Sequence, residues 1–222
     1  MSGTLSAILF SSACLVSTPS EPTAELVTPT AVLTVADVHP ALVDDREALY
    51  KKGISFSEFL SNAERRKERW NRNFEHSAVD VDLLDRARAV KGSWRLLAVA
   101  VDGCSDSVST IPYLASLEAK VDGLEMRIVD SKVGRQIMRD HLTADGREAT
   151  PTIVLLNDQF EEVGCFIERP APLQAWATKN KEKLGDEYLT QKFEWYDEDA
   201  GRHTVEAIIK LMEDAAAGKK GC

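Results

Sequence analysis

Cys104 is the residue whose type and position most strongly indicate chemistry. It follows a nearly continuous apolar run over residues 94–101 and precedes apolar residues at helical spacing, so it should lie between a buried strand and a helix. Sites in α/β proteins form beyond the carboxyl ends of strands. The positive end of a helix dipole also favours a thiolate. The sequence therefore predicts a nucleophilic thiol here.

The remaining cysteines and the histidines give weaker signals. Cys14, Cys165 and Cys222 are too scattered for a disulfide scaffold. We expect Cys165 to be a small core residue of a strand rather than a partner of Cys104, with Cys14 and Cys222 in tails. No two of the histidines stand at i+3 or i+4, so we expect neither a metal site nor a cofactor.

Three further groups of residues each allow two interpretations. Asp102 and Asp130 follow predicted strands and could pair for acid–base chemistry, although solvation of loop ends is favoured. The arginines and lysine over residues 65–72 alternate with glutamates, which is typical of a solvated helix face rather than a binding patch. Packing is likewise favoured over a binding surface for the aromatic residues of the C-terminal region, Trp176, Tyr188, Phe193, Trp195 and Tyr196.

Composition excludes several classes of protein. The 222 residues carry a formal charge of −9, which argues against general nucleic-acid binding. No apolar run approaches the roughly 20 residues of a membrane-spanning helix. The short apolar stretch near the N-terminus has no Lys or Arg ahead of it, so a cytoplasmic location is expected. Residues 11–14 also resemble a lipoprotein cleavage box, which leaves a lipid-anchored or exported form open.

The chain divides into four segments: an N-terminal arm or weak targeting segment over 1–45, a helical extension over 46–77, a main domain over 78–185 and a second helical extension over 186–222. Prolines and small polar residues mark the arm. Apolar periodicity predicts helices over 55–75, 80–90, from 105 to 121 with a kink at Pro112, 132–141, 172–184 and 202–217. It predicts strands over 94–101, 125–129, 152–156 and 161–167, the last two as a hairpin.

The order of these elements, the proline at 112 and the segment Thr150-Pro151-Thr152 resemble the thioredoxin fold. More narrowly, residues 102–107 and 127–130 are similar to uncharacterised thioredoxin-family proteins with a Trp-Cys-Gly-Asp type site. The resemblance, best over 94–170, implies an α/β thioredoxin-like fold with a central mixed sheet flanked by helices and extra helices at both ends. It also implies a cis bond before Pro151 that presents Thr150 to a substrate.

The chain departs from that pattern at three places. Active thioredoxins carry Cys-x-x-Cys, but Ser107 stands at the second cysteine and Gly103 replaces the preceding tryptophan. Thioredoxins have a buried acidic residue in the strand before the cysteine, and Ala98 stands at that position here. A disulfide within the site is therefore impossible, and what remains is monothiol exchange at Cys104 with an external thiol.

The resemblance thus implies a thiol or disulfide substrate, either a protein or a low-molecular-weight thiol. Thr150, Pro151, Ser105 and Ser107 would bind it. Ser105, Ser107 and neighbouring amides would also stabilise the thiolate, whereas Asp106 would oppose ionisation by like charge. The alternative is a redox-silent module that holds an extended peptide or protein segment in the same groove. The reactivity of the thiol at neutral pH distinguishes the two.

Overall fold

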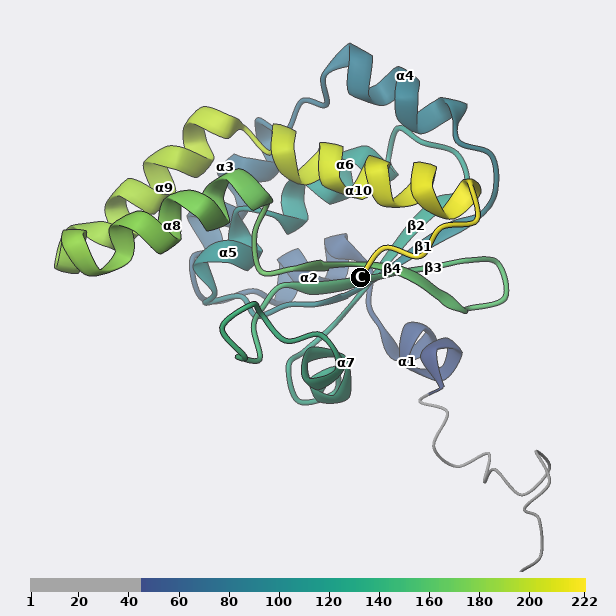
Figure 1. The fold of residues 1–222 in the computed structure, drawn as a ribbon, viewed down its shortest axis with the longest axis horizontal. Coiled ribbons are helices and arrows are strands. Elements are labelled where there is room, and N and C mark those ends of the chain that lie inside the picture. The colour runs from purple at the N-terminus through teal and green to yellow at the C-terminus, as the bar shows by residue number, and fades with distance from the viewer. Residues whose placement is uncertain (1–44) are drawn as a thin grey trace, which may run out of the picture. The chain divides into compact units, whose positions relative to one another are not determined.

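The computed structural model describes residues 45–222, so the predictions for 1–44, including Cys14, lie outside the described residues. Four strands form one sheet in the order β2-β1-β3-β4 (Figure 1). Their bounds are β1 Trp94–Val99, β2 Leu124–Val129, β3 Thr152–Leu156 and β4 Glu162–Ile167. β1 runs parallel to β2 and antiparallel to β3, and β3 and β4 form the expected hairpin. This mixed sheet flanked by helices confirms the predicted fold class.

Helices cover both faces of the sheet. Side chains alternate along β1, so Leu96 and Ala98 face one side while Leu97 and Val99 face the other. The first side packs against α4 (Val81–Ala89), α6 (Ile111–Glu118) and α10 (Arg202–Ala216), and the second packs against α1 (Arg46–Lys52) and α7 (Arg135–Asp140). This burial on both faces explains why the strand reads as a continuous apolar run.

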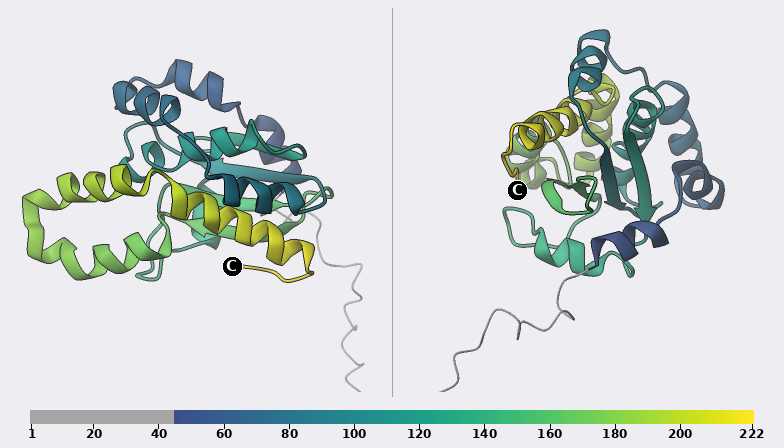
Figure 2. Two further views of the ribbon diagram at one scale, coloured as in Figure 1. Left: turned by 90° about the horizontal axis from the view of Figure 1, so that it is seen from above. Right: turned by 90° about the vertical axis from the view of Figure 1, so that its right-hand side faces the viewer.

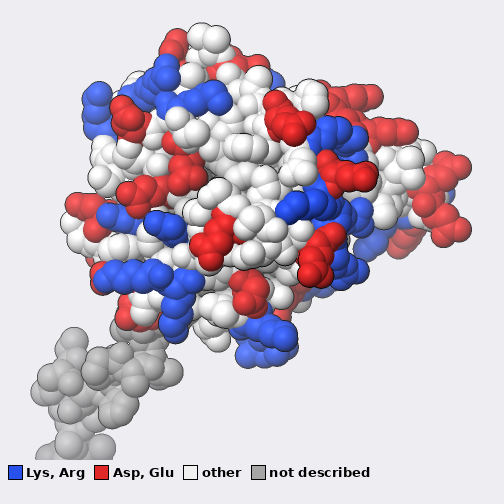
Figure 3. All heavy atoms as spheres, turned by 180° about the vertical axis from the view of Figure 1, so that it is seen from behind, with Lys and Arg blue, Asp and Glu red and all other residues white. Residues whose placement is uncertain are grey.

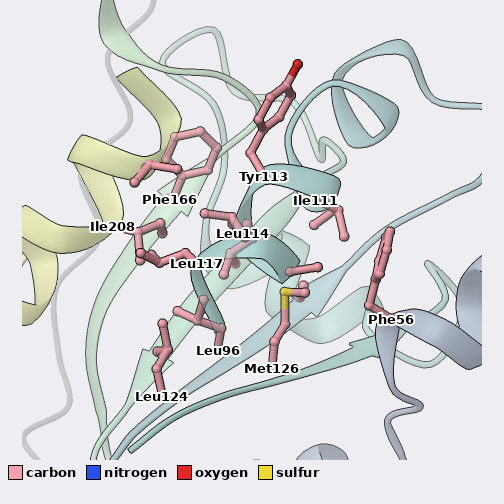
Figure 4. Close-up of a cluster of buried hydrophobic side chains, with 14 of the residues drawn as sticks. Phe56, Leu96, Ile111, Tyr113, Leu114, Leu117, Leu124, Met126, Phe166 and Ile208 are labelled. Carbon is pink, nitrogen blue, oxygen red and sulfur yellow. The ribbon is translucent and has the colours of Figure 1, made fainter. Parts of the chain in front are cut away.

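The larger core lies between β1, β2 and the helices of the first face. Figure 4 shows Leu114 and Leu117 of α6 directed at Leu96 and Met126 of the sheet. Ile208 of α10 enters the same cluster, and its side chain is almost fully buried. The C-terminal extension is therefore part of the packing that fixes the sheet.

The helix predicted over 55–75 is two helices, α2 (Phe56–Asn62) and α3 (Lys67–Glu75). Between them the backbone N–H groups of Glu64 and Arg65 donate to the carboxylate of Asp102 at 3.1 and 2.9 Å. Arg66 adopts a left-handed conformation with φ 56° before the chain turns into α3. α2 ends here because the amides that would continue it donate instead to Asp102, a residue far away in the sequence.

The helix after Cys104 is also divided, into α5 (Ser105–Val108) and α6. Pro112 has no N–H to donate to the carbonyl of Val108, four residues earlier. The side chain of Asn73 in α3 donates to that carbonyl instead, at 2.7 Å. Pro112 therefore lies in the first turn of a new helix, α6, rather than at a kink within one helix. The Val108 carbonyl, which the proline leaves without an amide donor, is hydrogen-bonded by α3 instead.

The C-terminal region holds one helix that the sequence analysis missed. The predicted helices correspond to α8 (Ala171–Leu184) and α10, and the acidic, aromatic stretch between them forms α9 (Tyr188–Asp199) after a short 3-10 turn. Figure 2 shows α8 and α9 side by side as a hairpin. Gly201 joins α9 to α10 at φ 77°, and a Cβ there would lie 2.1 Å from the ring of Tyr113. A glycine is required at this junction.

The charged side chains are mixed by sign on the face of the molecule shown in Figure 3, where blue and red atoms alternate. Several arginines of residues 45–222 form ion pairs with carboxylates, as in the pair of Arg86 with Glu213 at 3.0 Å. Across residues 45–222, no helix has the length and apolar character needed to cross a bilayer.

Candidate functional site

Cys104 lies at the end of the loop that follows β1 and caps the N-terminus of α5. Its Sγ accepts a hydrogen bond from the backbone N–H of Ser107 at 3.4 Å and donates one to the carbonyl of Thr150 at 3.0 Å. The peptide bond between Thr150 and Pro151 is cis. The thiol is half-buried, and it is the free cysteine among residues 45–222. The structure thus brings together a thiol, a helix start and the Thr150-Pro151 turn.

The two serines beside Cys104 contact it through the backbone alone. Ser107 is fully buried, and its hydroxyl accepts a hydrogen bond from the N–H of Val101 at 3.5 Å. The hydroxyl of Ser105 accepts from the Nζ of Lys192 in α9 at 2.7 Å. Only the amide of Ser107 reaches the sulfur, because both hydroxyls are engaged elsewhere.

Asp106, expected to oppose a thiolate at Cys104, lies in the core with its charge compensated. One carboxylate oxygen accepts from Lys192 Nζ at 2.9 Å, and the other accepts from the hydroxyl of Tyr196 at 2.8 Å. The Nε of Arg169 lies 3.7 Å away. Burial, together with the nearby Asp106 charge, raises the pKa of Tyr196 well above its usual value, so the tyrosine stays a donor.

A second carboxylate extends this network to the proline turn. Glu168, also buried, forms an ion pair with Arg169 and another with Arg147 at 3.3 Å. Its backbone N–H donates to the carbonyl of Pro151 at 2.8 Å. Burial alone would lower the pKa of Arg169, but the carboxylates of Asp106 and Glu168 outweigh it and raise that pKa. The guanidinium is therefore a permanent cation linking both halves of the site.

Arginines of the α2–α3 junction cover the other side of the loop. The Nε of Arg66 donates to the carbonyl of Gly103 at 2.8 Å. The guanidinium of Arg65 lies over Gly103 so closely that a Cβ there would be 2.9 Å from its Nε. The indole of Trp70 donates to the carbonyl of Asp102 at 2.9 Å. Part of the run read as a solvated helix face is thus packed against the site.

Asp102 and Asp130 both serve as acceptors for backbone N–H groups. The carboxylate of Asp130 accepts from the amides of Lys132 and Val133 at 2.6 and 3.2 Å. Desolvation alone would raise the pKa of Asp102, but hydrogen bonds from the backbone, Arg65 foremost, outweigh it and lower that pKa. These contacts support the loop-end interpretation over a catalytic pair. Both aspartates border a hollow of about 410 Å³ beyond the carboxyl ends of β1 and β2.

The sequence predicted Cys165 to be a small core residue, and this prediction is wrong. Cys165 forms a disulfide with Cys222. The reason is that the chain returns along the free edge of β4. Gly221 donates to the carbonyl of Val163 at 3.1 Å and accepts from the N–H of Cys165 at 2.9 Å. These contacts bring the two cysteines to a Cα–Cα distance of 5.1 Å. Cys104 takes no part in this pair.

The family model described as thioredoxin matches residues 53–184, more than half of the chain. The chain belongs to the thioredoxin family. Two solved structures resemble this thioredoxin: a protein of unknown function from Pseudomonas aeruginosa, with a TM-score of 0.58 at 20% identity, and an HIV epitope-scaffold, with 0.61 at 19%. Each alignment covers 75% of this chain and 96% of the other. Identities this low support the fold alone, and no curated protein matches the chain.

Several residues that contact the site were not assigned to it from the sequence, among them Lys192, Tyr196, Arg65 and Arg66. Lys192 and Tyr196 lie 86 and 90 positions from Asp106, so no local spacing relates them. The one available signal was a lysine within an otherwise acidic and aromatic segment. The arginines were visible as a basic run, but their contact with Gly103 depends on the break between α2 and α3.

Proposed function

We propose that this thioredoxin is a monothiol disulfide oxidoreductase in which Cys104 is the sole nucleophile. One observation carries the proposal. The free Cys104 thiol accepts a hydrogen bond from the Ser107 amide and donates one to the Thr150 carbonyl at 3.0 Å, beside the cis Pro151. An amide donor on the sulfur favours the anion that attacks disulfides. Membership of the thioredoxin family supports a thiol or disulfide substrate.

The exchange proceeds in two steps. The Cys104 thiolate attacks one sulfur of a substrate disulfide, forming a mixed disulfide and releasing the other sulfur as a thiolate that takes up a proton. Two low-molecular-weight thiols then act in turn. The first attacks the substrate sulfur of the mixed disulfide, which frees Cys104 and leaves that thiol bonded to the substrate sulfur. The second attacks the bonded small thiol, which releases the substrate sulfur as a thiol and forms the oxidised small-molecule disulfide. The substrate gains two electrons and two protons, and two external thiols lose them. Ser107 cannot replace the external thiol, since its side chain is a hydroxyl.

The residues around the Cys104 sulfur would have different roles in the exchange. Thr150 and Pro151 would align the substrate beside the thiol, and the amide of Ser107 at the start of α5 would stabilise the thiolate. Compensation of Asp106 by Lys192 supports the proposal, because it removes a negative charge that would otherwise act on the anion.

A coupled assay tests the proposal. We expect Cys104→Ser to abolish reduction of a small disulfide by glutathione. The matched control is the double variant Cys165→Ser/Cys222→Ser, which removes the other thiols of residues 45–222 without leaving an unpaired one, and it should keep most of the activity. Alkylation at neutral pH with mass mapping should modify Cys104 first. Equal loss in both variants would contradict the single-thiol mechanism.

A redox-silent binding module is the second candidate function. It is favoured by the hydrogen bond from the Cys104 thiol to Thr150, which satisfies the neutral form of the sulfur without ionisation. Wild-type protein without exchange activity, together with a Cys104 that resists alkylation while the protein is folded, would support this candidate instead. An extended peptide captured by that protein would then be the expected ligand.

A further inference from the structure

Four side chains with metal-binding atoms converge away from Cys104, at the free edge of β4. His141 follows α7, Glu162 and Cys165 belong to β4, and Cys222 lies on the returning segment. The His141 nitrogen and the two sulfurs lie within 4.8 Å of one another. Oε1 of Glu162 lies 2.7 Å from His141 Nε2 and 4.0 Å from the sulfur of Cys222. One nitrogen, one oxygen and two sulfurs therefore face a common point.

The backbone holds this cluster together without help from the disulfide. The segment containing Cys222 is fixed by the two hydrogen bonds of Gly221 to β4, which form a parallel bridge between Gly164 and Gly221. A Cβ on Gly221 would meet the side chain of Leu211 at 3.0 Å, so the glycine allows the close approach. After reduction the two thiols would consequently stay beside each other.

The disulfide uses only two of the four donors. Nε2 of His141 is buried, and its neighbour among residues 45–222 is Oε1 of Glu162 at 2.7 Å. The Nε of Arg46 donates to Oε2 of Glu162 at 3.0 Å, which leaves Oε1 directed at the cluster. A buried imidazole nitrogen beside a carboxylate oxygen and two sulfurs is a ligand set suited to zinc.

We propose that these four side chains bind one zinc ion when the disulfide is reduced, so that the disulfide and the zinc site are alternative states of one cluster. Two external thiols reduce the Cys165–Cys222 bond and become a disulfide themselves. Zinc then displaces the two thiol protons and binds both thiolates, with His141 and Glu162 as the other ligands. A two-electron oxidant such as diamide reverses this: the thiolates form the disulfide, diamide becomes the hydrazine, and the ion is released.

The geometry requires only small movements. Two thiolates at about 2.3 Å from a tetrahedral zinc lie about 3.8 Å apart, so the sulfurs must separate once their bond is broken. Cys222 is exposed, and its side chain can turn while Gly221 holds the backbone. Local spacing of histidines and cysteines predicts no metal site in this chain, because the four ligands come from separate segments.

Cobalt(II) is the probe for the test, because thiolate ligation gives charge-transfer absorption and a tetrahedral site gives intense visible bands. The full chain, reduced with a phosphine and kept under anaerobic conditions, should bind one equivalent of cobalt with both signatures, and zinc should displace it. Cys222→Ser should weaken cobalt binding by more than about 100-fold, since loss of even an outer partner costs 10–100-fold. The matched control Cys104→Ser should bind like the wild type.

Several results would contradict the zinc proposal. Absence of charge-transfer absorption from the reduced wild type would overturn the proposal, and so would unchanged binding by Cys222→Ser. The oxidised chain should bind no cobalt. Diamide added to the zinc-bound protein should release one zinc for each disulfide formed, as read by a chromogenic chelator. Retention of zinc after both thiols are lost would refute the alternation of the two states.

Discussion

Replacement of Lys192 by methionine is the most informative test of the buried charges around Asp106. Lys192 and Asp106 are 4% and 5% exposed, and their charged groups lie 2.9 Å apart. Methionine nearly preserves the volume of the lysine stem but removes the ammonium. Removing one partner of a buried pair costs about 3–5 kcal/mol. Because Tyr196 and Arg169 still contact Asp106, we expect the lower end, about 3 kcal/mol.

Urea unfolding followed by circular dichroism measures this loss, and a double-mutant cycle isolates its cause. A loss of about 3 kcal/mol corresponds to a fall in Tm of about 6–12 °C for a chain of this size. Asp106→Asn should also destabilise, by leaving the lysine unpaired. The double variant should be more stable than the sum of the single losses predicts, with a coupling of about 2–3 kcal/mol. Additive losses, or a cost of Lys192→Met below about 1 kcal/mol, would refute an interacting pair.

Three further predictions concern other parts of the molecule. Gly201→Ala should lower the free energy of unfolding by about 2–5 kcal/mol, because it combines a positive φ with overlap of the Tyr113 ring; wild-type stability in urea would contradict this. Burial raises the pKa of all four tyrosines, so above about pH 10 the unfolded chain releases protons that the folded chain keeps, and stability should fall as pH rises. Tyrosinate absorbance with a midpoint near pH 10, while circular dichroism stays native, would oppose that expectation. Ser107→Cys should form a disulfide with Cys104 on mild oxidation, since the 107 amide lies 3.4 Å from the sulfur; two persistent free thiols would show that the side chains do not meet.

The features predictable from the sequence are those with local causes. The apolar runs of β1 and β3 and the hairpin to β4 follow from residue type alone, and each lies within a residue or two of its predicted bounds. The position of Cys104 after β1 follows from the same pattern. Its contact with Thr150 spans 46 positions and was accessible only through resemblance to a known fold.

The remaining features depend on partners far away in the chain. The break between α2 and α3 requires Asp102, and the break before α6 is completed by Asn73. The disulfide of Cys165 requires the chain to return along β4. α9 escaped prediction because charged residues interrupt its apolar face, and tertiary contacts rather than helical propensity hold it. Among the polar contacts of the site, sequence reasoning could suggest residues but not their partners.

The packing of α10 on β4 has a consequence for the order in which the protein can be made. All four strands have been synthesised by Ile167, yet α10, which covers part of their first face beside α4 and α6, begins only at Arg202. Val205, Ile209 and the rest of its apolar side fill the larger core. A nascent chain therefore leaves part of this apolar face uncovered while α8 and α9 are being added, and exposed apolar surface of this kind is prone to bind chaperones or to aggregate. This part of the core is complete only after α10 has been synthesised.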